Sequence, residues 1–186
     1  KWQDVILLQP GDKFAEATKK AFAALDADED LWSEYAPRYS RAIIAAAQDQ
    51  KKRQTGWMTR IHPIALPTGR ILLPLYSDGY NMGLAAISDD MGKTWRASSP
   101  MVGFGPIQPT IVRKKDGELV AYCRDSGSAP NRALRSTSSD DGESWSPAVD
   151  SDIFNPGSSL EIIALKDGSW VNIYNDTEKG RHQLAL

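Results

Sequence analysis

Apolar residues recur at helical spacing in the first part of the chain. Between positions 14 and 25 they return every three or four residues, which predicts an amphipathic helix. Asp12 stands just before this segment, where an aspartate caps the first turn of a helix. A similar spacing further on predicts a second helix over residues 37–50, whose first residue is a proline, as first turns tolerate. We therefore expect residues 1–56 to form a helical segment.

From Trp57 onward the pattern changes to short apolar runs. They are rich in β-branched and aromatic side chains and are separated by Gly, Pro, Asn and Asp, which favours strands joined by turns. The runs fall into three cycles: RIHPIAL, RILLPLY and NMGLAAIS; IQPTIVR, ELVAYCR and RALRSTS; SLEIIAL, SWVNIY and RHQLAL. This order predicts an antiparallel meander over residues 57–186.

The first two cycles each end in the same motif. SDDMGKTW at positions 88–95 returns as SSDDGESW at positions 138–145, fifty positions later (138 minus 88). A fixed period of roughly 40 to 50 residues that holds four short strands is typical of a β-propeller blade. A third copy would begin at position 188, two beyond the last residue. The sequence therefore predicts an all-β partial propeller of about three blades, truncated in the third.

A closed propeller needs roughly four to eight blades. We therefore expect the remaining blades to come from further chain or from a second chain. Because the chain begins with Lys1, we also expect its native start to be missing.

The repeated motif shares Ser, Asp, Gly, a hydroxyl residue and Trp. Asp and Ser side chains bond nearby backbone N–H groups in turns, and Gly accepts a positive φ. We therefore expect Asp90 and Asp140 to stabilise turns and to take no part in chemistry. A calcium site is the alternative, but the motif lacks the spaced ligands and terminal Glu of an EF-hand. No metal and no cofactor are expected.

Charge and composition narrow the classes of partner. The formal net charge is −2 and the pI is near 5.7, so the chain has no general field that attracts phosphate backbones, and we expect no nucleic acid partner. No apolar run approaches the roughly 20 residues that cross a bilayer, so no membrane partner is expected. A lone Cys123 forms no internal disulfide and leaves the compartment undecided.

The motif resembles the Asp-box, or bacterial neuraminidase repeat, and its place in successive four-strand cycles is similar to that in the sialidase superfamily. The resemblance covers residues 60–186. It implies a six-bladed propeller that releases terminal sialic acid by means of an Arg triad on the carboxylate, an acid/base Asp, and a Tyr nucleophile assisted by Glu. The helical segment has no counterpart in that pattern and would pack on a propeller face, narrowing access to the site.

Two stretches of the first cycle match functional parts of that pattern. TRIHP resembles the Arg-Ile-Pro signature, so Arg60 would bind the substrate carboxylate, although His62 interrupts the signature. His62 is a candidate base, and a core histidine is the alternative. LYSDGYN places Asp78 where sialidases carry the acid/base Asp, and a simple turn is the alternative. Tyr76 and Tyr80 flank it and would stack on a sugar or pack in the core.

The later cycles add three candidates. Arg124 and Asp125 leave the second strand of the second cycle and would contact the substrate there. Glu161 alternates with apolar neighbours in the third cycle and would face either a catalytic cavity or a salt bridge. If the resemblance held throughout, the nucleophilic Tyr would lie beyond Leu186.

These observations favour a sialidase-like, exo-acting glycoside hydrolase on anionic carbohydrate. Arg60 and Arg124 would bind the substrate carboxylate and Asp78 would donate a proton. A polysaccharide lyase or rhamnosidase-like enzyme that uses His62 is one alternative, and a non-catalytic glycan-binding propeller is the other.

Overall fold

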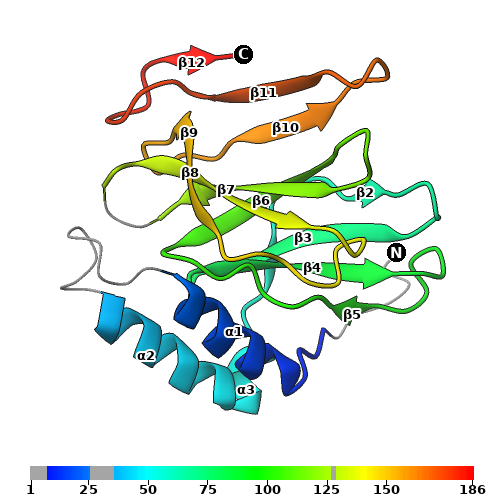
Figure 1. The fold of residues 1–186 in the computed structure, drawn as a ribbon, viewed down its shortest axis with the longest axis vertical. Helices are drawn as coiled ribbons and strands as arrows, with labels where there is room; N and C mark the ends of the chain where they lie inside the picture. Colours follow the sequence, from blue (N-terminus) through cyan, green and yellow to red (C-terminus); the bar gives the residue numbers. More distant parts are fainter. Residues whose placement is uncertain (1–7, 26–35, 127–128) are drawn as a thin grey trace, which may run out of the picture.

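In the computed structural model, which describes residues 8–25, 36–126 and 129–186, three antiparallel sheets follow one another along the chain (Figure 1). The first sheet holds β1 (Met58–Thr59), β2 (Ile64–Ala65), β3 (Ile71–Ser77), β4 (Met82–Ser88) and β5 (Arg96–Ala97). The second holds β6 (Pro106–Arg113), β7 (Leu119–Asp125), β8 (Arg132–Ser138) and β9 (Val149–Phe154). The third holds β10 (Glu161–Ala164), β11 (Trp170–Asn175) and β12 (Leu184–Ala185). The predicted meander is therefore confirmed.

The first predicted strand is wrong over part of its length. Residues 60–63 lie outside the strands, and β1 and β2 on either side of them both pair with β3. The pairing moves from Thr59 opposite Leu75 to Ile64 opposite Leu72. Pro63 contributes to this break because proline has no N–H to donate to a ladder. The break frees Arg60 and His62 from regular pairing.

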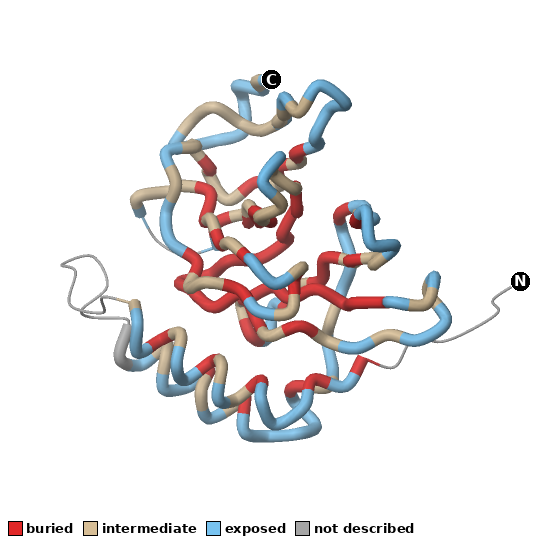
Figure 2. Tube along the Cα trace, turned by 45° about the vertical axis from the view of Figure 1, so that its right-hand side comes forward, coloured by how far each residue is buried: buried red, intermediate tan, exposed pale blue. Residues whose placement is uncertain are grey.

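The sheets share cores across their faces. Strand β6 packs against β3 and β4 on one side and against β10 on the other. Leu72, Ile111 and Leu119 belong to one buried cluster that joins the first two sheets, whereas Val112 and Ile162 belong to a cluster that joins the second and third. Figure 2 shows buried residues concentrated in the first two sheets, whereas residues of the third sheet are mostly intermediate or exposed. The second sheet is therefore the central layer.

Helices α1 (Lys13–Ala24) and α2 (Ala36–Gln48) pack on the first sheet, and α3 (Gln50–Arg53) contacts α2. The second predicted helix is thus divided, because Asp49 is extended and its side chain caps α3 by accepting the N–H of Lys52 at 3.1 Å. The predicted capping role of Asp12 is wrong. Asp12 makes no side-chain cap and instead pairs with the buried guanidinium of Arg53.

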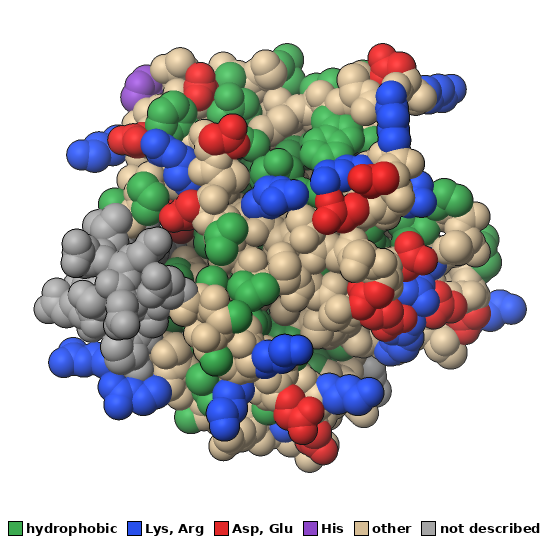
Figure 3. Space-filling view, viewed as in Figure 1, with side chains coloured by type: hydrophobic (Ala, Val, Ile, Leu, Met, Phe, Trp, Pro, Cys, Tyr) green, Lys and Arg blue, Asp and Glu red, His purple; other side chains and the backbone are tan. Residues whose placement is uncertain are grey.

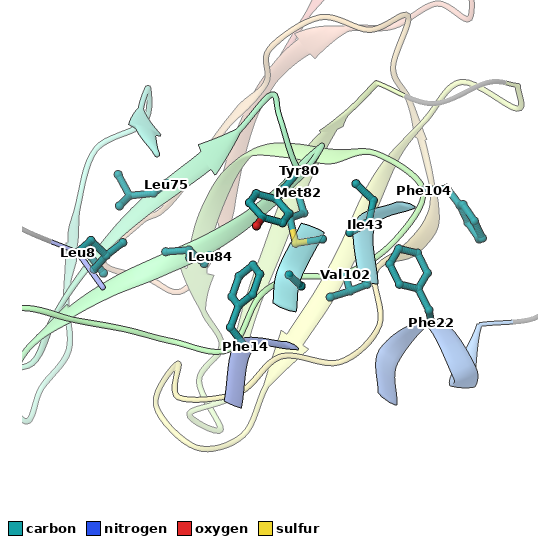
Figure 4. Packing of buried hydrophobic residues seen from close by; sticks show 12 residues of the cluster. Leu8, Phe14, Phe22, Ile43, Leu75, Tyr80, Met82, Leu84, Val102 and Phe104 are labelled. Carbon is teal, nitrogen blue, oxygen red and sulfur yellow. The ribbon is translucent and has the colours of Figure 1, made fainter. Parts of the chain in front are cut away.

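An aromatic core joins the helices to the sheet. Phe14 of α1 meets the ring of Tyr80 edge-on with centroids 5.4 Å apart, and Trp57 stacks on Tyr80 at 5.9 Å. Figure 4 shows Tyr80 and Met82 between the helices and the sheet, with Phe22 and other apolar residues around them. This burial is the main source of stability for short helices, which are marginal on their own.

The two repeated motifs form matching turns. Asp90 accepts the N–H of Thr94 at 2.8 Å and its hydroxyl at 2.7 Å, while the Ser88 hydroxyl accepts the N–H of Gly92 at 2.8 Å. Asp140 likewise accepts the N–H of Ser144 at 2.9 Å. The predicted turn-stabilising role is therefore confirmed.

The charged residues of these turns also join the first two sheets. Arg70 lies 2.6 Å from Asp89 and 3.0 Å from Glu143, and Arg96 reaches the same two carboxylates. Because these pairs are partly exposed, each contributes about 1 kcal/mol or less.

Candidate functional site

Six polar side chains come together from the three sheets: Gln108 and Thr110 lie on β6 and Glu161 on β10, whereas Arg60 and His62 lie between β1 and β2, and Ser159 lies just before β10. Hydrogen bonds and one ion pair join them in two series. One series is Arg60, Gln108 and Ser159, and the other is His62, Thr110 and Glu161. Both have spacings of 48 and then 51 residues (108 minus 60 and 159 minus 108; 110 minus 62 and 161 minus 110). We call these six residues the axial cluster.

The first series is held by a short chain of hydrogen bonds. Arg60 Nε donates to Ser159 Oγ at 2.8 Å, and Ser159 Oγ donates in turn to Gln108 Oε1 at 2.6 Å. Gln108 has a φ of +51° and lies where the register of β6 against β7 shifts, so a bulge directs its side chain. The Arg60 bond uses only Nε. Within the described parts of the chain, both terminal nitrogens of Arg60 are without a hydrogen-bond partner and can receive an anion.

The second series centres on a carboxylate. Glu161 Oε1 lies 3.0 Å from His62 Nδ1 and accepts the hydroxyl of Thr110 at 2.9 Å. Thr110 is fully buried, whereas the side chains of His62 and Glu161 are 44% and 32% exposed. His62 also lines a cavity of about 380 Å³ with Ile64, Arg113 and other residues. The imidazole is therefore fixed from one side and open on the other.

A second and a third arginine approach the turn that carries Ser159. Arg181 donates to the carbonyl oxygen of Gly157 at 2.7 Å, and Arg124 Nη2 lies 4.0 Å from where a Cβ on Gly157 would stand. Arg124 Nε is buried and has no hydrogen-bond partner among the described residues. Asn155 holds the turn, since it accepts the N–H of Gly157 at 3.1 Å. Guanidinium groups from all three sheets thus flank one turn.

Figure 3 shows acidic and basic side chains intermixed over the face seen in Figure 1, so that face carries no broad patch of one sign.

The other predicted residues lie elsewhere. Asp78 is exposed on the turn after β3, where it lines a cavity of about 400 Å³ with Lys52, Met58 and other residues. Among the described residues, no hydrogen bond or ion pair joins Asp78 to the axial cluster. Tyr76 is half-buried in β3 opposite Met58, so its proposed contact with a sugar stays a prediction.

Two predicted substrate contacts need correction. Tyr80 is only 3% exposed, and its hydroxyl donates to the carbonyl oxygen of Ala46 at 2.8 Å, so it packs under the helices and does not stack on a sugar. Burial raises the pKa of Tyr80 to about 12. Asp125 is 4% exposed and its N–H donates to Asn155, so this residue supports the turn from below.

Sequence reasoning missed Gln108, Thr110, Ser159 and Arg181. None belongs to a recognisable motif. The only signal for Gln108, Thr110 and Ser159 was their spacing, which repeats from one sheet to the next, and Arg181 had no such signal.

The described residues hold neither a metal cluster nor a membrane-spanning helix. Within residues 8–25, 36–126 and 129–186, no three His, Cys, Asp or Glu side chains gather as a metal site. Across the same residues, no helix has the length and apolar character needed to cross a membrane.

Comparisons with known proteins identify the family and the fold. The family model described as a BNR repeat-like domain matches residues 39–186, which includes most of α2 as well as the sheets. The anhydrosialidase of Macrobdella decora is 31% identical over 124 residues, covering 66% of this chain and 15% of that protein. The sialidase of Micromonospora viridifaciens is 34% identical over 86 residues, covering 46% and 13%. The chain thus spans a small part of the curated relatives that it matches.

A solved structure is similar over a comparable length. The NanB sialidase of Streptococcus pneumoniae superimposes with a TM-score of 0.59 at 25% identity, covering 70% of this chain and 21% of that one. The match supports a sialidase-like β-propeller fold, of which the described residues form three sheets that do not close into a ring.

Proposed function

Because the chain belongs to the family of BNR repeat-like domains, we propose that it forms part of a sialidase-like glycoside hydrolase that acts on an anionic, carboxylated carbohydrate. The curated relatives are named anhydrosialidase and sialidase, which supports the reaction class. The sialidase resemblance further supports release of a terminal sugar, so we propose exo-action.

The observation that carries the substrate class is the convergence of arginines. Arg60 has both terminal nitrogens open, and Arg124 carries a buried Nε without a partner among the described residues. A planar guanidinium binds a carboxylate through two parallel hydrogen bonds. A bound carboxylate would also satisfy the buried Nε of Arg124, whose desolvation is otherwise costly. A carboxylated sugar therefore fits this site better than a neutral one.

Asp78 is the proposed proton donor to the glycosidic oxygen. Asp78 lines a cavity together with Met58 of β1, and Met58 lies two residues before Arg60 in the chain. A carboxyl group at that edge would reach a sugar that extends from the axial cluster toward the helices. General acid catalysis of this kind contributes about 10² to 10⁴ in rate.

A second candidate reaction is favoured by His62. Its imidazole lies in the series next to Arg60 and is fixed by Glu161 at 3.0 Å. An imidazole base beside an arginine-bound uronate suits a lyase, in which one group removes a proton adjacent to the carboxylate. A rhamnosidase-like reaction would use the same histidine.

The test is binding of N-acetylneuraminic acid and of its methyl ester, measured by calorimetry on the full chain. We expect the acid to bind more tightly than the ester, and Arg60→Lys or Arg124→Lys to weaken binding of the acid by about tenfold or more. Arg70→Lys is the matched control, because Arg70 belongs to the ion pairs of the repeated turns. Equal affinity for acid and ester would contradict the proposal.

The products of the reaction distinguish a sialidase from a lyase. Whole enzyme that contains this chain should release free sialic acid from sialyllactose if it is a sialidase. A lyase would instead give a product that absorbs in the near ultraviolet from an oligosaccharide that contains glucuronate. Asp78→Asn should reduce hydrolysis by about 10² to 10⁴ while binding of the acid persists.

A further inference from the structure

We propose that Glu161, itself anchored by Thr110, holds His62 in the tautomer with its proton on Nδ1, so that Nε2 acts as the proton acceptor at the arginine site. This inference rests on the proposed function, because it takes the arginine cluster as the place where the sugar binds. It assigns Glu161 as a positioning residue, His62 as the proton-transfer group and Thr110 as the anchor.

The hydrogen bond from His62 to Glu161 fixes the tautomer of the imidazole. A neutral imidazole carries one proton, and the hydrogen bond made by one ring nitrogen decides which nitrogen holds it. Glu161 Oε1 lies 3.0 Å from His62 Nδ1, and an ionised carboxylate is only an acceptor. The Nδ1 atom must therefore carry the proton in the neutral ring, which leaves a lone pair on Nε2.

Thr110 fixes the carboxylate of Glu161. The Thr110 hydroxyl donates to the same Oε1 atom at 2.9 Å, and it accepts the backbone N–H of Ile162 at 3.3 Å. Thr110 is fully buried on β6, and Ile162 follows Glu161 on β10. A buried hydroxyl from the neighbouring sheet thus sets the position of the carboxylate, which in turn sets the plane of the imidazole.

The imidazole ring of His62 is accessible on its Nε2 side. Nε2 has no hydrogen-bond partner among the described residues, and the His62 side chain is 44% exposed. A purely structural ion pair would not need an exposed ring with an open nitrogen. Arg60 lies two residues before His62 and is hydrogen-bonded to Ser159, which lies just before the strand that carries Glu161. A sugar whose carboxylate is held by Arg60 would therefore present its ring atoms beside His62.

The chemistry is a simple proton transfer. A hydroxyl group or water at the bound sugar gives its proton to Nε2, and the electron pair of the broken O–H bond stays on the oxygen. The imidazolium that forms carries a positive charge, which the Glu161 carboxylate stabilises from the Nδ1 side. The same arrangement returns the proton when the reaction reverses or proceeds.

The test is nitrogen NMR of the full chain labelled with ¹⁵N-histidine. His62 and His182 are the only histidines, so a His182→Gln variant leaves one imidazole to observe. At a pH where the ring is neutral, we expect a protonated Nδ1 with slowed exchange of its proton. Glu161→Ala should remove that protected Nδ1–H signal. A protonated Nε2 in the unsubstituted chain, or an unchanged signal in Glu161→Ala, would overturn the proposal.

Matched variants separate positioning from folding. Thr110→Val should mix the two tautomers, whereas Thr110→Ser keeps the hydroxyl and should preserve the Nδ1–H form. Glu143→Gln removes a comparable carboxylate from the ion pairs of the repeated turns and should leave the imidazole signals unchanged. A tautomer change in Glu143→Gln that matches the one in Glu161→Ala would overturn the assignment.

Addition of N-acetylneuraminic acid distinguishes this inference from the proposed function. We expect the acid to shift the Nε2 resonance of His62 in the unsubstituted chain and to leave it unshifted in an Arg60→Ala variant. Absence of any binding of the acid counts against the proposed substrate. Binding of the acid without a shift at Nε2 counts against the proton-transfer role of His62.

Discussion

The two repeated turns contain a matched pair of glycines that isolates the effect of core packing. Gly92 and Gly142 occupy the same position in the motif and have nearly the same φ, +84° and +85°. A Cβ on Gly92 would meet only Trp95, at an ordinary 3.6 Å. A Cβ on Gly142 would stand 2.9 Å and 3.1 Å from the two methyl carbons of Leu72. Leu72 is fully buried, so it has little room to move.

The expected magnitudes follow from these distances. Both Gly92→Ala and Gly142→Ala place a Cβ in the left-handed region, which costs about 1 to 2 kcal/mol. Overpacking a well-filled core adds about 1 to 3 kcal/mol, and only Gly142 adds it. We therefore expect Gly142→Ala to reduce the free energy of unfolding by about 1 to 3 kcal/mol more than Gly92→Ala does.

Urea unfolding of the full chain measures this difference. The two variants should share the slope of the unsubstituted chain and differ in the urea midpoint. In a double-mutant cycle, Leu72→Ala should be less destabilising in the Gly142→Ala background than alone, because it removes the overlapping methyl groups. The reasoning would be refuted if Gly92→Ala and Gly142→Ala reduced the free energy of unfolding equally. It would also be refuted if the effects of Gly142→Ala and Leu72→Ala were strictly additive.

Three further outcomes are expected. Hydrogen bonds from the backbone and side chain of Thr94 hold the pKa of Asp90 down at about 2. The carboxylate therefore stabilises the fold above about pH 4, and this stabilisation is lost as the pH falls toward 2. Asp90→Ala should thus weaken the acid dependence of the urea midpoint between pH 5 and 2.5. Tyr80→Phe should cost about 1 kcal/mol, measured by thermal unfolding, because it removes the bond to Ala46 and keeps the ring; an unchanged midpoint would contradict that bond. Phe14→Ala should cost about 3 to 5 kcal/mol and make α1 more sensitive to proteolysis, whereas unchanged cleavage would show that the aromatic core does not hold the helix.

The sequence predicted the fold well where local chemistry decides the structure. The two motifs specify their turns through Asp, Ser and Gly, whose side-chain and backbone preferences act within five residues. The prediction was wrong where distant contacts decide it. Asp12 would cap α1 in isolation, but Arg53 lies close enough in the folded chain to pair with its carboxylate.

The site was less predictable than the fold. Arg60 and Arg124 could be proposed because arginine suits carboxylates, yet both lie against a turn that comes from distant sequence, at Ser159 and Gly157. Ser159 and Thr110 are common residue types whose roles depend on which strands become neighbours. Tyr80 showed the opposite difficulty, since its place beside Asp78 in the sequence concealed that the helices cover its ring.

The order of strands within the sheets bears on how the chain is synthesised. In the described residues each sheet is assembled from strands that follow one another in sequence, and the helices pack on the first sheet. Such local pairing lowers the entropy cost of closing loops and favours rapid formation. A nascent chain can therefore complete each sheet as it leaves the ribosome, whereas the axial cluster forms only after the strand that carries Glu161 has emerged, some hundred residues after Arg60 (161 minus 60). The first two sheets can thus form before the axial cluster does.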